Sequence, residues 1–334
     1  MVRKTTATFL AVCLLFSFCF IFAGCSKDGS GEYPVVFDGV TIKEEPKNIV
    51  VLNDCIADII SYIGYDVKMV GRSVSCDQSF LSVVPVVGAS DSPSVDLIKS
   101  NGADLVICDE TLNSTTKEKL EKEKITTVTL SVPHNKAELE TLYGNIGMIL
   151  GGNVKGKEKG LLAFSKLYDT MKSYQSSVSK KIVKTDCYLF LSESGQLATF
   201  KSATLQSEMF SYNAAVNIFS EQKSEQEFVI VDKSQLKMGT PTFIFYDNDK
   251  VLQMIQNDSE LSNMSAITQN RVKKIPLKNF YRYGTTFDET LYEMMTYMYI
   301  DSEATPDSAT VATQSPTQTA TQVGTQPATQ NHIE

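Results

Sequence analysis

NIVVLNDCIADIISYIGYDVKMVGRS, residues 48–73, holds two short apolar runs with a helical segment between them. The runs NIVVLN (48–53) and VKMVG (67–71) have the length and apolar character of parallel strands that are buried on both faces. Between them, isoleucines recur at the i, i+3, i+4, i+7 spacing of one helical face, and a glycine that can end the helix follows: Ile56, Ile59, Ile60, Ile63 and Gly64. This unit predicts a parallel sheet with helices packed on it.

The same pattern continues on both sides of this unit. Upstream, YPVVFDGVTIKEEP (33–46) is typical of a small hairpin that turns at Asp38-Gly39. Downstream, DLVICD (104–109) and ITTVTL (125–130) are predicted strands. Asn135, with a glutamate three residues later, has the capping-box signature of a further helix.

A long helical stretch from about Lys157 to Lys181 leads to a second cycle of strands and helices. Its predicted strands are CYLFLSES (187–194), FVIVD (228–232), TFIFYD (242–247) and RVKKIP (271–276). Helices are expected near 203–213 and from about Thr286 to Ile300.

We therefore predict an α/β fold of two strand–helix lobes with mainly parallel sheets, joined by one long rigid helix. Ligands of such sheets bind outside the carboxyl ends of the strands, so a ligand cleft is expected between the lobes. The expected segments are a signal peptide (1–24), a flexible leash (25–34), an N-terminal lobe (35–152), a linking helix (153–182), a C-terminal lobe (183–301) and a disordered Thr/Gln-rich tail (302–334).

The amino-acid composition argues against several classes of function. The 334 residues are 42% hydrophobic and 21% charged, which is typical of a folded protein. The net charge of −8 makes nucleic acid an unexpected partner, because phosphate binding needs a concentrated basic surface. With two histidines in the whole chain, a metal site held by the protein alone and histidine-based catalysis are both unexpected. We predict a protein that is not an enzyme and has no intrinsic cofactor.

The N-terminus has the features of an export signal, because Arg3 and Lys4 precede the uncharged run TFLAVCLLFSFCFIFAG (8–24). A membrane-spanning helix would need about 20 apolar residues. Small residues before Cys25 resemble a bacterial lipoprotein signal, in which this cysteine is acylated and becomes the N-terminus. The resemblance implies a lipid anchor that holds the protein outside the cytoplasm, at the extracellular face or in a periplasm. A plain secreted protein or a single-helix anchor is the alternative.

The C-terminal tail has a different composition. Residues 302–334 contain no aromatic residue, Lys or Arg, and Thr-Gln recurs at 313, 317, 321, 325 and 329. Such a tract has too little apolar surface to offset its chain entropy, so it is expected to be disordered.

Three partial motifs give no support for catalysis. GGNVKGK (151–157) resembles a phosphate-binding loop, but Glu158 follows where a Ser or Thr would hold magnesium. LSESG (191–195) lacks the first glycine of a nucleophile elbow. His134 is the one histidine outside the tail, and a solvated loop histidine is its simplest interpretation.

The order of these features resembles the substrate-binding proteins of ABC importers for iron–siderophore complexes, haem and cobalamin. The resemblance runs from about Val40 to Ile300, and three stretches carry it: NIVVLNDCIADIISYIGYDVKMVGRS (48–73), VVPVVGASDSPSVDLIKSNGADLVIC (83–108) and LSNMSAITQNRVKKIP (261–276). Val70-Gly71 supplies the "VG" turn of that family, whereas Ala103 replaces the proline of its "PDLV" strand.

The resemblance implies a preformed cleft lined by loops at the strand ends. The residues predicted to bind ligand are Asp54, Arg72, Cys76, Lys201, Tyr246, Tyr281, Arg282 and Tyr283. The arginines would hold an anionic chelate through charge-assisted hydrogen bonds. The alternative is that both arginines are surface residues and the aromatic run 280–283 packs against the last helix. Cys55, Cys76 and Cys108 could be buried apolar residues, a disulfide pair or soft-metal ligands.

The implied function is capture of a ferric siderophore or related metal chelate by a lipid-anchored, monomeric protein that delivers it to an ABC permease and its ATPase. A corrinoid or haem binder is the alternative within the family. A surface adhesion or signalling lipoprotein with the same fold is the alternative outside it.

The resemblance also implies one acidic residue on each lobe for docking to the permease. On the first lobe this residue is Asp96, although a carboxylate at a helix start is also favoured by the helix dipole. On the second lobe the family pattern falls on Ser234, so either Asp232, or the nearby Glu225 and Glu227, would substitute, or the second contact is not ionic; Asp232 is the predicted residue.

Overall fold

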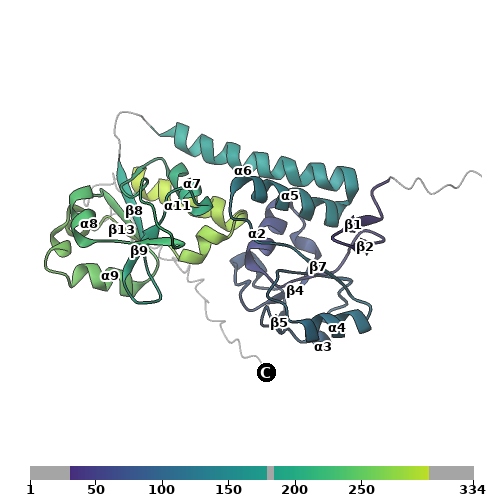
Figure 1. Cartoon of the computed structure of the whole chain (residues 1–334). Coiled ribbons are helices and arrows are strands. Elements are labelled where there is room, and N and C mark those ends of the chain that lie inside the picture. Colours follow the sequence, from purple (N-terminus) through teal and green to yellow (C-terminus); the bar gives the residue numbers. More distant parts are fainter. Residues whose placement is uncertain (1–30, 179–183, 301–334) are drawn as a thin grey trace, which may run out of the picture.

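A computed structural model describes residues 31–178 and 184–300, which form two lobes lying side by side (Figure 1). Helix α6 (Lys157–Ser177) runs along the top of both lobes in this view. Cys25 and the Thr/Gln-rich tail lie outside the described residues. Within those residues, no helix is long and apolar enough to cross a lipid bilayer. The predicted fold class, two strand–helix lobes joined by a long helix, is confirmed.

The first lobe contains a five-stranded sheet in which every pair of neighbouring strands is parallel. In spatial order its strands are β5 (Val86–Gly88), β4 (Met69–Ser73), β3 (Ile49–Val51), β6 (Leu105–Cys108) and β7 (Thr126–Thr129). The small hairpin β1 (Val35–Phe37) and β2 (Val40–Ile42) lies beside β7. Every residue of β3 and β6 is buried, which explains why their sequences are continuously apolar.

Helices cover both faces of this sheet. One face packs on α3 (Val95–Ser100) and α4 (Ser114–Lys122), and the other on α2 (Asp54–Ile63) and α5 (Lys136–Gly151). The helix ends follow the sequence signals. The Asn53 side chain accepts the amide of Ile56 at the start of α2, and Gly64 ends that helix with a φ of 83°. Asn135 accepts the amide of Glu138, as its capping box predicts.

The second lobe has a mixed sheet. Its strands in order are β11 (Phe228–Ile230), β9 (Leu197–Phe200), β8 (Thr185–Leu191), β12 (Phe243–Tyr246) and β13 (Val272–Lys274), with β10 (Val216–Asn217) also paired to β8. The strands β8, β12, β13 and β10 are parallel, whereas β9 and β11 are antiparallel to their neighbours. Its helices are α7 (Leu205–Phe210), α8 (Lys233–Gly239), α9 (Asp249–Gln256), α10 (Ser265–Thr268) and α11 (Thr285–Tyr299).

The two rejected glycine motifs are structural turns. GGNVKGK (151–157) contains the π-helical turn 152–156 between α5 and α6. A Cβ atom at Gly147 would lie 2.2 Å from the carbonyl oxygen of Gly156, so glycine allows the two helices to pack closely. LSESG (191–195) forms the turn between β8 and β9, where the amide of Gly195 donates to the carbonyl of Ser192. The antiparallel strand β9 that follows was not predicted from the sequence.

One hydrophobic core extends through both lobes. It includes the α2 and α5 side of the first sheet, α6 and α11, and the Tyr188, Phe200 and Phe245 side of the second sheet. Two smaller cores lie on the outer faces, under α3 and α4 in the first lobe and under α8 and α9 in the second. Because a shared core cannot open without exposing apolar surface to water, the lobes are expected to move little relative to each other.

A buried carboxylate joins the lobes beside this core. Asp58 of α2 is fully buried and accepts the backbone amides of Gly284 and Thr286, at 2.8 and 3.1 Å, and the hydroxyl of Thr286. A residue of the first lobe therefore caps the N-terminus of α11 in the second. Nearby, the hydroxyl of Tyr143 donates to the carbonyl oxygen of Tyr283 at 2.6 Å.

Candidate ligand site at the carboxyl edge of the first lobe

The loops that follow β3, β4, β6 and β7 meet at one edge of the first sheet, because the strands are parallel; we call it the carboxyl edge. These loops carry Asp54, Ser75, Asp77, Asp109 and the segment 131–134. The side-chain amide of Asn53 donates to Asp109 at 2.7 Å and so links the β3 loop to the β6 loop.

The second lobe covers one half of the carboxyl edge through Arg282, whose side chain is 3% exposed. Its guanidinium pairs with Asp54 at 3.0 Å and with Asp77, and it also donates to the carbonyl of Ser75 at 3.1 Å. Lys278 pairs with Asp77 as well. Burial alone would raise the pKa of Asp77, but the hydrogen bonds and charges of Lys278 and Arg282 outweigh it and lower the pKa.

Arg72 is engaged within the first lobe. Its guanidinium donates to three backbone carbonyls, those of Cys76 at 2.8 Å and of Leu81 and Val84 at 3.0 Å. This side chain therefore fixes the loop between β4 and β5. The loop also buries Cys76 completely, and this burial raises the pKa of its thiol to about 11.

The other half of the carboxyl edge is hollow. A pocket of about 1300 Å³ lies beside β6, β7 and the first turns of α5, with the tip of the β1–β2 hairpin at its rim. We call it the strand-end pocket, and its lining is Phe37, Asp38, Asp109, Glu110, Thr111, Thr129, Leu130, Ser131, Val132, Pro133, His134, Asn135, Ala137, Glu138, Thr141, Leu142 and Asn145. It combines apolar walls with a few oriented polar groups, which is the usual character of a small-molecule site.

The carboxylates of this pocket are held in place by neutral donors. Asp109 accepts the side-chain amide of Asn53 and the backbone amide of Thr111, and it is 9% exposed. Glu110 accepts the hydroxyl of Ser131. Glu138 accepts the amide of His134 at 2.8 Å, and this hydrogen bond lowers the pKa of Glu138.

The predicted ligand residues of the second lobe are unevenly placed. Tyr281 is 40% exposed, whereas Tyr246 is 8% exposed. Tyr283 is fully buried, and its hydroxyl accepts the side-chain amide of Gln206 at 2.8 Å. Lys201 is half-buried and follows β9, which runs antiparallel to β8, so it does not follow the carboxyl end of a parallel strand.

Sequence reasoning missed the contributions of Asp77, Lys278 and His134. Asp77 and Lys278 form an ion pair between residues 201 positions apart, which no local pattern reveals. His134 was interpreted as a solvated loop residue, and it is exposed, but it also lines the strand-end pocket. Its position on the loop that follows the predicted strand 125–130 could have indicated that it lies at the ligand edge of the sheet. The cysteines at 55, 76, 108 and 187 are free and buried, which is the first of the predicted alternatives for the first three.

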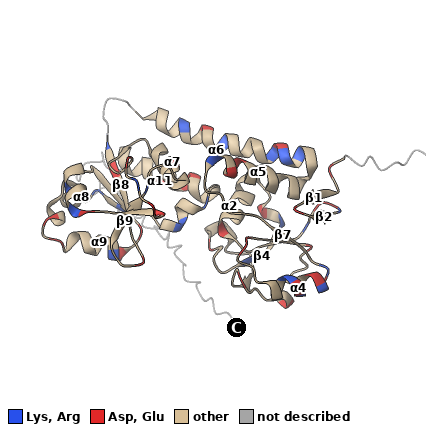
Figure 2. Cartoon of the chain, in the orientation of Figure 1, with Lys and Arg blue, Asp and Glu red and all other residues tan. Residues whose placement is uncertain are grey.

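The two predicted docking acids occupy similar positions. Asp96 is exposed in the first turn of α3. Asp232 is exposed and forms the N-cap of α8, where it accepts the amide of Ser234 at 2.7 Å. Lysines and arginines are interspersed with acidic residues over both lobes (Figure 2).

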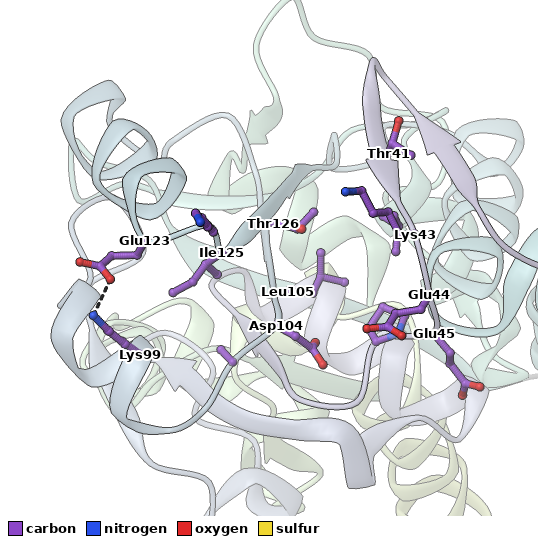
Figure 3. Close-up of a pocket in the computed structure, with 14 residues that line it drawn as sticks. Thr41, Lys43, Glu44, Glu45, Lys99, Asp104, Leu105, Glu123, Ile125 and Thr126 are labelled. Carbon is purple, nitrogen blue, oxygen red and sulfur yellow. Dashed lines mark hydrogen bonds and ion pairs between the residues drawn. The ribbon is translucent and has the colours of Figure 1, made fainter.

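A second hollow, of about 510 Å³, lies at the opposite edge of the first sheet, beside the amino ends of β6 and β7 (Figure 3). Several of its charged residues already have partners. Lys99 pairs with Glu123, and Asp104 accepts the amides of Lys47 and Asn48. Because ligands of parallel sheets bind at the carboxyl ends, the strand-end pocket is the better candidate site.

Comparison with known proteins decides the family. The family model described as "Periplasmic binding protein" matches residues 49–278, about two-thirds of the chain. The chain belongs to this family. It is a solute-binding protein and not an enzyme, and the family that the sequence resemblance predicted is confirmed.

Relatives of this periplasmic binding protein are distant in sequence. An uncharacterized ABC transporter substrate-binding lipoprotein of Bacillus subtilis, YvrC, is 24% identical over 290 residues, covering 83% of this chain and 89% of the relative. A possible iron-binding protein from Staphylococcus epidermidis has a TM-score of 0.59 at 16% identity, covering 77% of this chain and 100% of the other. The periplasmic haem-binding protein HutB of Vibrio cholerae has a TM-score of 0.60 at 14% identity, covering 75% and 98%. At these identities the structures support the fold alone.

Proposed function

We propose that this protein is the lipid-anchored substrate-binding component of an ABC importer and captures a ferric siderophore or related metal chelate. Family membership and the likeness to the lipoprotein of Bacillus subtilis support the importer role. The observation that carries the ligand part is the strand-end pocket, whose volume of about 1300 Å³ is large enough for a chelate. A haem or corrinoid ligand is the second candidate, favoured by the likeness to a haem-binding protein.

The predicted ligand residues take two roles in this proposal. Asp54 and Tyr281 are partly exposed near the contact between the lobes and do not line the strand-end pocket, and they stay predictions as ligand contacts. Arg72, Cys76, Arg282 and Tyr283 are engaged or buried, and they position the loops. Lys201 and Tyr246 stay predictions as ligand contacts.

The proposal includes two further contacts. Acylated Cys25 anchors the chain to the membrane, outside the cytoplasm. Asp96 and Asp232, each at the start of an exposed helix, pair with basic residues of the permease. The protein acts as a monomer with the permease and its ATPase, and the metal arrives within the ligand.

A thermal-shift screen over ferric siderophores, haem and corrinoids tests the proposal. A ligand at 100 times its Kd stabilises the folded protein by about 2.7 kcal/mol, which shifts the melting temperature measurably. Thr141→Trp is the matched variant, because Thr141 is exposed on α5 and lines the strand-end pocket. This variant should melt like the parent without ligand and lose the shift with ligand. If no chelate raises the melting temperature of the parent, the proposed function is wrong.

A further inference from the structure

The strand-end pocket has an unbalanced charge. Among the described residues that line it, four are acidic, namely Asp38, Asp109, Glu110 and Glu138, and none is Lys or Arg. Asp109, Glu110 and Glu138 accept hydrogen bonds from neutral hydroxyls, side-chain amides and backbone amides. Among the described residues, none of the four acids forms an ion pair with a lysine or arginine. Asp109, Glu110 and Glu138 are therefore oriented by hydrogen bonds from neutral groups, and no salt bridge to any of the four acids is found among the described residues.

The lysines near the pocket have other contacts. Lys117 reaches the lining residue Thr129, whose hydroxyl oxygen lies 3.5 Å from its ammonium nitrogen. Lys136 precedes the lining residue Ala137, but its ammonium lies over the ring of Tyr168, 4.1 Å from the ring centroid. Neither is a member of the pocket lining.

The two arginines predicted to hold an anion do not line this pocket. Arg282 is buried against Asp54 and Asp77, and its release would leave Asp54 without its cationic partner. Arg72 donates to three backbone carbonyls of its own loop. An anionic chelate in the pocket would thus face carboxylates and would find no arginine among the described lining residues.

We infer that the strand-end pocket selects a chelate that carries positive charge, either as a net cationic complex or through a protonated amine arm. The apolar wall, which includes Phe37, Val132 and Leu142, contacts the body of the chelate. Glu110, together with Asp109 and Glu138, accepts charge-assisted hydrogen bonds from the cationic group. This inference rests on the proposed function, and it reverses the ligand charge expected from the arginines.

A charge series on one scaffold tests the inference. Ferrioxamine B has one ammonium arm, its N-acetyl derivative is neutral there, and its N-succinyl derivative is anionic. Cationic aquacobinamide and neutral dicyanocobinamide form a second series. Affinities are measured by fluorescence quenching with the full chain. In at least one series, the cationic member should bind at least about tenfold more tightly than the neutral one, as expected for a charge-assisted hydrogen bond. The difference should shrink at high salt.

Matched variants locate the effect. Glu110→Gln keeps the size of the side chain and an acceptor oxygen but removes the charge, so it should reduce the preference for the cationic member over the neutral one several-fold. Glu118→Gln on α4 is the control, because Glu118 is exposed and lies outside the pocket lining. This control should leave the preference unchanged.

The outcomes separate the two claims. If neutral or anionic members bind as tightly as the cationic ones, or if Glu118→Gln changes the preference as much as Glu110→Gln does, the inference is wrong and the proposed function stands. If none of these chelates binds and the wider thermal-shift screen is also negative, the proposed function is wrong and the inference fails with it.

Discussion

The two lobes share an architecture but face each other with different chemistry. At its carboxyl edge, the first lobe presents acidic residues, including Asp54, Asp77, Asp109 and Glu110. The second lobe contributes Arg282 and Lys278, which pair with acids of the first lobe. Behind them lies a buried aromatic cluster, in which Phe280 packs on Tyr188 with ring centroids 4.5 Å apart. The contact between the lobes is therefore held by complementary charge over a shared apolar core.

The difference shows how one sheet edge can serve two purposes. On the β3–β4 half, the basic residues of the second lobe compensate the acids and close the edge. On the β6–β7 half, no basic residue of the second lobe lines the edge in the part of the chain that the structure describes, and the edge is open as the strand-end pocket. The contact between the lobes, which we call the joint, and the candidate binding site thus lie side by side on the loops of the carboxyl edge.

The largest expected effect on stability comes from adding a methyl group at the joint between the lobes. A Cβ atom at Gly284 would lie 2.4 Å from the carbonyl oxygen of Asp58, so Gly284→Ala must push α2 and α11 apart. We expect a loss of about 3 kcal/mol in the free energy of unfolding, measured by urea denaturation. Gly195→Ala is the control, because a Cβ there has no neighbour within 4 Å; its φ of 76° should limit the loss to about 1 kcal/mol. Equal losses in both variants would contradict the crowding argument.

The second prediction concerns the ion pairs of the joint. Arg282→Met keeps most of the buried side-chain volume but leaves Asp54 and Asp77 without their shared partner. We expect a loss of about 2 kcal/mol of stability. In a double-mutant cycle, combining it with Asp77→Asn should show a coupling energy of about 1 kcal/mol. Strictly additive losses would mean that the pair does not join the lobes.

The third prediction uses pH to compare a buried acid in each lobe. Burial raises the pKa of Asp58 to about 6 and that of Asp186 to about 7, against an ordinary value of 3.8. In both cases the folded protein holds a proton that the unfolded chain has lost. Stability should therefore be greatest near pH 4 and fall as pH rises, until about pH 6 for Asp58 and about pH 7 for Asp186.

Variants separate the two contributions to this pH profile. Asp58→Asn should make the decline between pH 4 and 6 less steep, and Asp186→Asn should make it less steep over the whole range from pH 4 to 7 and remove the part above pH 6, both measured as melting temperature against pH. Acids whose pKa is lowered, such as Asp77, act below pH 4 and leave this window unaffected. A profile that rises from pH 4 to 7 in the parent would contradict both assignments.

The smallest effect on the isolated protein is expected at the docking residues. Asp96 and Asp232 are exposed, so Asp96→Arg should change stability by about 0.5 kcal/mol, and Asp232→Arg by about 1 kcal/mol because it removes the N-cap of α8; both should leave ligand affinity unchanged. In reconstituted transporter, each should abolish ligand uptake and ligand-stimulated ATPase activity. The exposed α4 variant Glu118→Arg is the control. Normal transport by both docking variants would refute the docking proposal.

The alternation of strands and helices, and with it the fold class, could be predicted from local sequence patterns. The isoleucine spacing in 56–63, the end of α2 at Gly64 and the capping box at Asn135 are all present as predicted. Each of these signals acts within about eight residues, because helix periodicity and capping are local properties of the chain. The antiparallel strand β9 escaped prediction because its pairing depends on a neighbouring strand as much as on its own residues.

Which of the predicted site residues are available to a ligand depends on tertiary packing and is not visible in the sequence. Arg282 meets Asp54 across 228 positions of sequence, and the hydroxyl of Tyr143 meets the backbone of Tyr283 across 140. Arg72, near the carboxyl end of β4, donates instead to backbone carbonyls of the loop that follows this strand. The sequence shows which strand end carries a charged residue. The partner of that residue depends on how distant segments pack. A side chain whose charge is already paired is not available to bind a ligand.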